Sequence, residues 1–240
     1  MVIKAVLFDL DGTLLGNNKD KFGQMYFKLL GKHFAYLIPP EELIDAVYKV
    51  FEAMTLNTGP YTNQEVFEKT FYSIMNYPKD EIQKNIDEFH KKDFVLMKND
   101  AEVKLEAREL IKTAFDLGFD VVIATNPIFP SEAIWQRLSW ANVDDFSYKL
   151  VTTYENSHAS KPQLAYYKEV LSKINHMPEE CLMVGDEDMD MVAAKMGIKT
   201  FLVPSATTNI SMETPKPDYT GSLYDVMKLL EENSTSSIAE

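Results

Sequence analysis

Two aspartates, Asp9 and Asp11, follow an apolar run in the stretch VLFDLDGTLL at residues 6–15. A carboxylate in such surroundings is costly unless a charge or a hydrogen-bond donor meets it. Carboxylates two residues apart on a continuing strand point the same way, so they repel each other unless a cation lies between them or one is protonated. Mg²⁺ removes this repulsion, because it favours carboxylates, waters and a substrate phosphate as ligands. The pair therefore indicates a divalent cation at the end of a strand.

Polar residues able to take part in the same chemistry follow other apolar runs of the chain. The runs at 119–125 and 181–185 end in such residues or lead directly into them, and the run at 149–153 does so after a short loop. The residues concerned are a hydroxyl, an amide, an ammonium and two further carboxylates: Thr125, Asn126, Lys161, Asp186 and Asp190. Ligands of an open parallel sheet bind at the carboxyl ends of its strands, so we expect these side chains to meet at one edge.

Ordinary structural roles compete with these assignments. Thr125 could cap the following turn, and Lys161 could be a solvated surface lysine. Acidic residues are also common in the first turn of a helix, where the helix dipole favours them, which would explain part of the run GDEDMD at 185–190. Asp186 is harder to explain in this way, because it directly follows an apolar strand. A spacing of four places Asp190 beside it on one helical face.

The strands that would carry these side chains are short, apolar and rich in β-branched residues, as buried parallel strands are. They are expected at 3–10, 119–125, 149–153, 181–185 and 199–203. Helical patterns separate the later strands, at 101–117, 130–141, 162–174 and 188–196. Within the second of these, Ile134, Trp135 and Leu138 are expected to share one face. Alternating strands and helices predict an α/β fold with a parallel sheet covered on both faces.

One long interval interrupts this alternation. It contains four helical patterns, separated by proline or glycine, at 19–36, 40–56, 63–75 and 79–94. We therefore expect a separate helical domain inserted after the first strand. The expected boundaries are residues 1–15 and 99–232 for the core, 16–98 for the helical domain, and 233–240 for a serine-rich, flexible tail.

Taken together, the motifs resemble those of the haloacid dehalogenase (HAD) superfamily. D-x-D-G-T-L after a strand, a strand ending in threonine, a Lys-Pro pair, and G-D-x-x-x-D after another strand occur here in that order. The implied Rossmann-like core covers about two-thirds of the chain, and D-x-D-G-T at residues 9–13 is the most specific part of the match. The helical insertion is similar to the C1 type of cap found in this superfamily.

The resemblance implies catalytic roles for the motif residues. Asp9 would be a nucleophile that forms an aspartyl-phosphate, and Asp11 would protonate the leaving oxygen and then activate water. The hydroxyl of Thr125 and the backbone N–H of Asn126 would bind the phosphate. Lys161 would offset the charge of the phosphate and of Asp9.

The resemblance also implies Mg²⁺ as the cofactor. Asp9 and Asp186 would be ligands, together with the backbone carbonyl of Asp11, and Asp190 would support the metal directly or through water. Glu187 departs from the family pattern, because a small hydroxyl residue is common at that position.

The implied activity is that of a phosphoric monoester hydrolase acting on a small phosphorylated molecule. A sugar phosphomutase shares the core motifs and stays open as an alternative, as does a non-catalytic binding protein on the same fold. Dehalogenases of the superfamily need no Mg²⁺, so the additional acids disfavour that activity. A non-catalytic protein would be expected to lack Asp9, Asp11 or Lys161, and all three are present.

The substrate itself cannot be identified from the helical domain, which carries no recognisable motif. Its aromatic pairs with helical spacing, Phe67 with Phe71 and Tyr48 with Phe51, indicate packing inside that domain rather than a substrate pocket.

Composition excludes several classes of partner. The net charge of −13 and the pI of about 4.8 disfavour nucleic acid and anionic membranes. No apolar stretch approaches the roughly 18 residues that span a bilayer. The first residues are too short and too charged a run for a signal peptide, so we expect a cytoplasmic protein. The single cysteine, Cys181, excludes an internal disulfide and is expected to be an inert buried thiol. The oligomeric state stays open.

Overall fold

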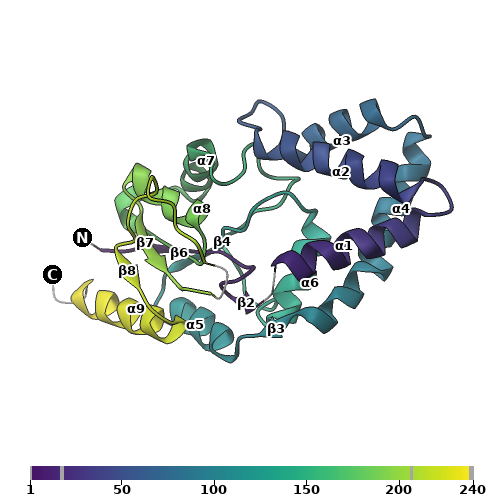
Figure 1. Ribbon diagram of the computed structural model, residues 1–240. Helices are drawn as coiled ribbons and strands as arrows, with labels where there is room; N and C mark the ends of the chain where they lie inside the picture. The colour runs from purple at the N-terminus through teal and green to yellow at the C-terminus, as the bar shows by residue number, and fades with distance from the viewer. Residues whose placement is uncertain (1, 17–18, 206–207, 238–240) are drawn as a thin grey trace.

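A parallel sheet lies at the centre of the computed structural model, which describes residues 2–16, 19–205 and 208–237 (Figure 1). In these residues the sheet has six strands in the order β5-β4-β1-β6-β7-β8. Their bounds are Ala5–Phe8 (β1), Asp120–Ile123 (β4), Leu150–Val151 (β5), Cys181–Gly185 (β6), Lys199–Leu202 (β7) and Tyr219–Thr220 (β8). Because β1 pairs with both β4 and β6, the residues that follow it emerge at the middle of the sheet edge. The predicted α/β fold is confirmed.

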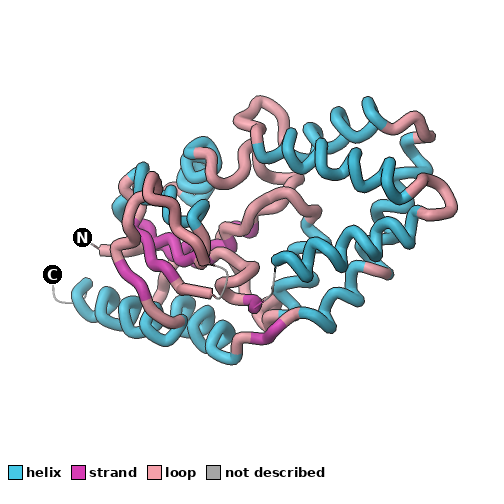
Figure 2. Tube along the Cα trace, viewed as in Figure 1, coloured by secondary structure: helices cyan, strands magenta, loops and turns pink. Residues whose placement is uncertain are grey.

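Helices cover both faces of this sheet, as Figure 2 shows by the cyan tubes on either side of the magenta strands. Ala5 and Leu7 of β1 pack with α7, Leu164–Ile174. Val6 and Phe8 belong to the opposite core, which includes α5 and α9, Leu105–Asp116 and Leu223–Ser237. Successive side chains of a strand point to opposite faces, so β1 has to be apolar throughout.

The chain between β1 and β4 forms a helical insertion beside the sheet (Figure 1). Its elements are α1 (Lys19–Phe34), α2 (Pro40–Thr55), α3 (Asn63–Ile74), α4 (Lys79–Lys92) and the 3₁₀ helix η1 (Phe94–Asp100). Helix α3 begins with a reciprocal cap, since the Thr62 hydroxyl accepts from the Glu65 N–H while the Glu65 carboxylate accepts from the Thr62 N–H. Phe34, Phe89 and Phe94 are fully buried and hold the helices of the insertion together.

Two short strands connect the insertion to the core. Strand β2, Leu15–Gly16, pairs antiparallel with β3, Glu102–Val103. This pairing explains why α5 begins at Leu105 and not at residue 101, where the sequence pattern suggested a helix start. We propose that the helical domain begins near residue 16 and ends near residue 98, as predicted, because both positions lie close to this strand pair.

Other helix ends also differ from the sequence expectation. Helix α7 begins two residues late, because the Gln163 N–H donates to the Ser160 carbonyl (2.9 Å) in a preceding turn. The helix expected at 188–196 is α8, Asp188–Met191, followed by the 3₁₀ helix η3, Val192–Met196. It ends at Gly197, whose left-handed backbone (φ +88°) fits the predicted C-cap.

Helix α9 was missed in the sequence. It packs on α5, where the Thr113 hydroxyl lies 3.4 Å from the sulfur of Met227. The helix continues to Ser237, so the first part of the expected flexible tail at 233–240 is helical. Residues 238–240 lie outside the described part of the chain.

Two expectations from composition can be compared with the structure. In the described ranges, no helix has both the length and the hydropathy that crossing a bilayer requires. Cys181 is buried at the start of β6, and burial raises the pKa of its thiol to about 12, so the thiolate is not formed at neutral pH.

Candidate active site

Asp9 lies directly after β1, at the middle of the carboxyl edge of the sheet. Its backbone N–H donates to the Val184 carbonyl on β6 (2.9 Å), which extends the strand pairing by one residue. Its side chain is buried, and carboxylate oxygen Oδ1 accepts from Lys161 Nζ at 2.8 Å. The strand pairing and the ion pair together fix the position of the Asp9 carboxylate.

Lys161 joins three strand ends. Its Nζ, which is fully buried, contacts Asp9 at 2.8 Å and Asp190 Oδ1 at 2.5 Å. Its backbone N–H donates to Asn126 Oδ1 at 3.2 Å, next to the end of β4. The alternative of a solvated surface lysine is therefore wrong.

A third carboxylate, Asp186, completes a compact acidic cluster after β6. Asp9, Asp186 and Asp190 each offer an oxygen within 4.8 Å of the others, and all three residues are buried. The Thr13 hydroxyl donates weakly to Asp186 Oδ1 (3.4 Å), and the Glu187 N–H donates to Asp190 Oδ2 (3.1 Å). These bonds hold the carboxylates close together despite their charge.

Two glycines make room for the acidic cluster. A Cβ on Gly12, whose φ is +94°, would lie 2.2 Å from Asp186 Oδ2, and one on Gly185 would lie 2.3 Å from the carboxylate of Asp190. Any other residue at either position would displace a carboxylate. The glycines of the D-x-D-G-T and G-D-x-x-x-D motifs thus shape the site.

The electrostatics of the cluster favour a bound cation. Burial raises the pKa of Asp190 to about 7, with Lys161 opposing the rise and Asp9 adding to it. Burial by itself lowers the pKa of Lys161, but Asp190 and Asp9 together raise it well above its usual value. Three carboxylates around one ammonium leave an excess of negative charge, and an all-oxygen donor set of this kind fits Mg²⁺.

Thr125 and Asn126 lie after β4, beside Asp9. The Thr125 carbonyl accepts from the Thr152 hydroxyl (2.7 Å) and from the Tyr166 hydroxyl (3.0 Å), which anchors this turn to the core. Both residues line the same cavity as Asp9. The structure thus brings the predicted phosphate-binding residues to one edge of the sheet.

Asp11, two residues after Asp9, pairs with a cation at the cavity wall. Its carboxylate pairs with the guanidinium of Arg137 on helix α6, Ser131–Trp140. Asp11 also lines the cavity, and its side chain is 20% exposed. The side chain of Asp11 is therefore held at the cavity wall, apart from the oxygens of Asp9, Asp186 and Asp190.

The sequence analysis did not select Arg137, although its position in the apolar pattern of α6 could have indicated it. The buried residues of α6 follow helical spacing, and Arg137 lies three and four residues after the buried Ile134 and Ala133. Trp135, expected on the same face, is 37% exposed, so that expectation is wrong. A charged residue at a buried helical position indicates a specific partner.

Lys104 is a second residue near the site that the sequence analysis did not select. Its Nζ donates to the Gly12 carbonyl, next to the acidic cluster. Burial lowers the pKa of Lys104, while Asp186 and Asp9 oppose the shift. The pairing of β2 with β3 brings it there, and two-residue strands leave no readable pattern.

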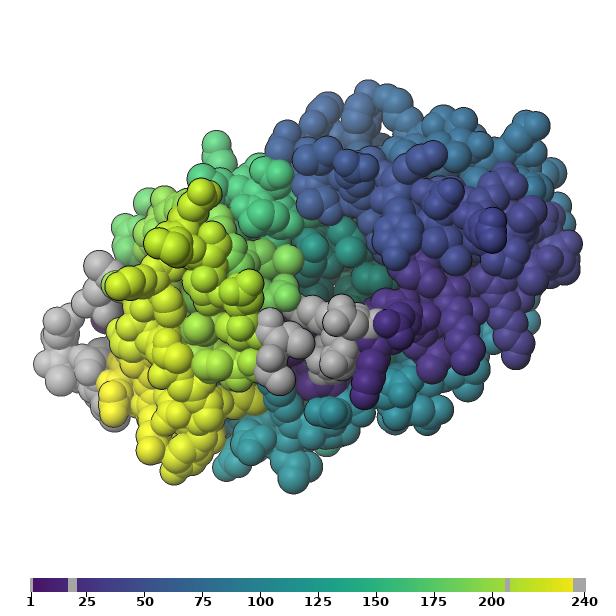
Figure 3. All heavy atoms as spheres, viewed as in Figure 1, coloured from purple at the N-terminus to yellow at the C-terminus, as the bar shows by residue number. Residues whose placement is uncertain are grey.

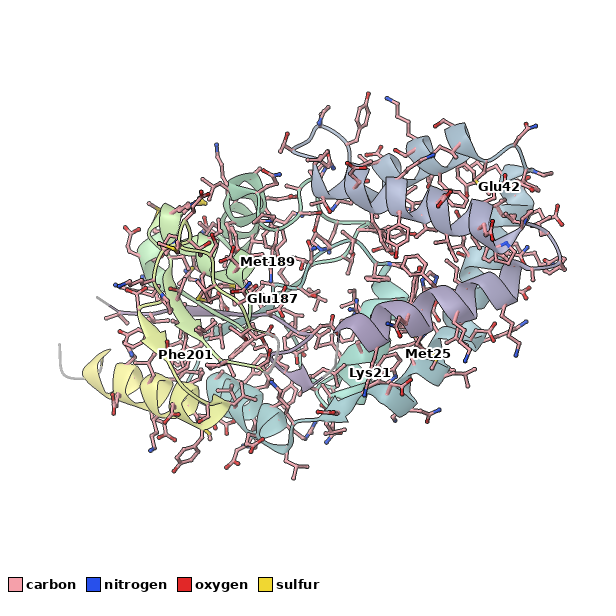
Figure 4. All side chains as sticks on the ribbon, viewed as in Figure 1. Lys21, Met25, Glu42, Glu187, Met189 and Phe201 are labelled. Atoms are coloured by element: carbon pink, nitrogen blue, oxygen red, sulfur yellow. The ribbon has the colours of Figure 1, made fainter. Side chains whose placement is uncertain are left out.

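The cavity beside Asp9 has a volume of about 250 Å³ and lies between the core and the insertion. Figure 3 shows the surface hollowed between these two parts, and in Figure 4 Glu187 and Met189 lie at the end of the core that faces α1 and α2. The wall on the side of the insertion is aromatic, formed by Phe22, Tyr26, Phe27 and Phe51. Its size and lining suit a small molecule.

The aromatic pairs of the insertion differ in their exposure. Phe67 and Phe71 stack with ring centroids 5.3 Å apart, and Phe71 is buried, as expected for internal packing. Tyr48, by contrast, is 57% exposed, and Phe51 lines the cavity. Both nevertheless pack inside the insertion, because the Phe27 ring lies 4.6 Å from that of Tyr48 and 6.5 Å from that of Phe51, centroid to centroid, so this pair also meets the expectation while Phe51 borders the cavity.

Comparisons with known proteins identify relatives of similar sequence. Pyrophosphatase PpaX of Anoxybacillus flavithermus is 26% identical over 205 residues, covering 83% of each chain. Pyrophosphatase PpaX of Bacillus anthracis is 25% identical over 239 residues, covering 98% of this chain and 100% of the relative.

Solved structures share the fold. A HAD phosphatase from Thermococcus onnurineus matches with a TM-score of 0.59 at 17% identity, over 95% of this chain and 98% of the other. The putative HAD-hydrolase YfnB from Bacillus subtilis, solved bound to magnesium, matches with a TM-score of 0.58 at 20% identity, over 96% of this chain and 99% of the other. The model of the family "haloacid dehalogenase-like hydrolase" matches residues 3–197. The chain therefore belongs to the haloacid dehalogenase-like hydrolase family.

Proposed function

We propose that the protein is a Mg²⁺-dependent phosphatase that hydrolyses a small phosphorylated metabolite through an aspartyl-phosphate on Asp9. One observation carries the proposal: Asp9 lies at the cavity, bound to a buried Lys161 and within 4.8 Å of Asp186 and Asp190. A nucleophilic carboxylate needs nearby positive charge to accept a phosphate dianion, and this arrangement can supply it.

In the first step, an oxygen of Asp9 attacks phosphorus. The new bond forms between that oxygen and phosphorus while the bond to the leaving oxygen breaks, and Asp11, which has to be protonated and released from its ion pair with Arg137 for this step, gives the leaving oxygen a proton. Lys161 orients Asp9 and offsets its charge. The Thr125 hydroxyl and the Asn126 N–H bind the phosphoryl oxygens, so that attack and departure are in line.

In the second step, water attacks the phosphorus of the aspartyl-phosphate. Asp11, now ionised, takes a proton from that water, and inorganic phosphate leaves as Asp9 is restored. Mg²⁺, held by Asp9, Asp186, Asp190 and the backbone carbonyl of Asp11, would neutralise charge that develops on the phosphoryl oxygens. The insertion limits access of bulk water and selects the substrate by the shape of the cavity.

The relatives suggest a first compound to test. The similar proteins from Anoxybacillus flavithermus and Bacillus anthracis are named pyrophosphatases, so pyrophosphate belongs in any substrate set. The cavity of about 250 Å³ supports small substrates over polymers.

We expect Mg²⁺-dependent phosphate release from at least one small phosphorylated compound. The measurement is a phosphate assay over pyrophosphate and sugar, nucleotide and organic-acid phosphates, with and without EDTA. Isomer formation without phosphate release would point instead to a phosphomutase. Inactivity across the whole set would favour a non-catalytic binding protein.

Mg²⁺ is also expected to stabilise the folded protein, because it offsets the repulsion among three buried carboxylates. Saturation at about 100 times the dissociation constant corresponds to roughly 2.7 kcal/mol. For a chain of this size, this shifts the melting temperature by about 5–10 °C. Differential scanning calorimetry with and without Mg²⁺ measures the shift.

The matched variant is Asp186→Asn, which keeps the shape and removes one ligand charge. The Mg²⁺-induced shift should largely disappear in this variant and persist in Asp116→Asn, at an exposed position of α5. An unchanged shift in Asp186→Asn would place the ion elsewhere.

A further inference from the structure

Arg137 is a buried cation to which the proposed mechanism assigns no role. It is 2% exposed, and its side chain reaches from α6 to the cavity. Its Cζ lies 4.8 Å from the ring centroid of Phe129 and 5.8 Å from that of Phe22. The two aromatic rings and its ion pair with Asp11 hold the guanidinium at the cavity wall.

The guanidinium is only partly used. Nε donates to the Ala133 carbonyl (3.3 Å), and Nη1 pairs with Asp11. Nη2 is buried and has no hydrogen-bond partner in the described ranges of the chain. A buried donor without an acceptor is costly, and a guanidinium presents its N–H groups as a fork that matches a carboxylate or a phosphate. The missing acceptor is therefore expected to come from a ligand.

The charge of the cavity limits what that ligand can be. Asp9, Asp11 and Glu187 line it, and Arg137 is the one cationic side chain among the described lining residues. The reacting phosphoryl group has Lys161 and the cation site nearby. A second anion on the same molecule would face mainly carboxylates unless it met Arg137.

We infer that Arg137 determines substrate specificity by binding a second anionic group, a carboxylate or a phosphate, on the leaving group of the substrate. The inference rests on the proposed function, because Asp11 serves the leaving oxygen there and Arg137 contacts Asp11. The second anion then lies within a few bonds of that oxygen. Phosphoglycolate and pyrophosphate have this chemistry, whereas ethyl phosphate lacks it.

Steady-state kinetics with Mg²⁺ test the inference on the full chain. The wild-type protein should prefer phosphoglycolate or pyrophosphate to ethyl phosphate in kcat/KM. Arg137→Met, which removes the charge and keeps the bulk, should lower kcat/KM for the preferred compound by ~100-fold and for ethyl phosphate by less than ~3-fold. Arg108→Met serves as the control, because the side chain of this other arginine is 41% exposed and does not line the cavity, and it should change neither value.

The outcomes separate the possible roles of Arg137. A selective loss for phosphoglycolate identifies a carboxylate as the second anion, and one for pyrophosphate identifies a phosphate. An equal loss for all three compounds would overturn the inference and make Arg137 a positioning residue for Asp11. If Arg137→Met does not fold, Arg137→Lys takes its place. It keeps the positive charge without the paired N–H groups of the guanidinium, so kcat/KM should fall about tenfold for the preferred compound only. A wild-type protein without any preference overturns the inference by itself.

A binding experiment separates this inference from the proposed function. If no compound of the full set of phosphate esters and pyrophosphate releases phosphate, the proposed function has failed, and non-hydrolysable phosphonates still report on Arg137. Isothermal titration calorimetry with Mg²⁺ should give tighter binding of phosphonoacetate or methylenediphosphonate than of ethylphosphonate, and Arg137→Met should remove the difference. Equal affinities in the wild-type protein would overturn the inference.

Discussion

Asp9→Asn is expected to reduce phosphate release by about 10⁴-fold or more, because the amide is not a nucleophile toward phosphorus. The protein should stay folded. Asparagine has the shape of aspartate, and Lys161 keeps Asp190 as a partner at 2.5 Å. Circular dichroism and the melting temperature check the fold, and the phosphate assay checks turnover.

A chemical readout makes this prediction specific to the nucleophile. Wild-type protein quenched in acid during turnover should contain a peptide with residue 9 that is heavier by one phosphoryl group, and Asp9→Asn should lack it. Asp116→Asn, at an exposed position, serves as the matched control with normal turnover. Normal phosphate release by Asp9→Asn would remove Asp9 from the role of nucleophile.

Lys161→Met is expected to lower the free energy of unfolding by about 3–5 kcal/mol, besides abolishing turnover. The ammonium is fully buried between Asp9 and Asp190, so its removal leaves two buried carboxylates without their shared counter-charge. Urea denaturation measures the loss. Because a bound cation also neutralises these carboxylates, Mg²⁺ should recover part of it.

The matched control is Lys92→Met, which breaks a pair between exposed side chains, Lys92 and Glu88 at 2.9 Å. Such surface pairs contribute about 0–1 kcal/mol, so this variant should differ little from wild type. If the two variants lost the same amount of stability, Lys161 would not be the central cation of the site.

The clustering of the site could be predicted because it follows from local sequence and one rule of topology. Asp9 and Asp186 come directly after buried strands and Thr125 lies two residues after one, and parallel strands bring their carboxyl ends to one edge. Lys161 follows a strand of only two residues, after a loop. It could still be selected, because its Lys-Pro pair occurs between the strand that ends in threonine and the G-D-x-x-x-D motif.

The partners of these residues could not be predicted in the same way. Arg137 meets Asp11 only because the buried face of α6 packs against elements far away in the sequence, which no local motif states. Lys104 reaches Gly12 through the pairing of β2 with β3. Such contacts depend on how elements far apart in the sequence pack, whereas the predicted contacts depend on where strands end.

The strand pair β2–β3 also has a consequence for how substrate range can evolve in this protein. Leu15 lies opposite Val103, so the polypeptide leaves the core and returns to it at adjacent points. An insertion whose two ends are adjacent can be lengthened, shortened or replaced without disturbing β1, β4 or the site residues that follow these strands. The contacts that the insertion makes with a substrate can thus change independently of the reaction, whereas those made by Arg137 on α6 stay with the core.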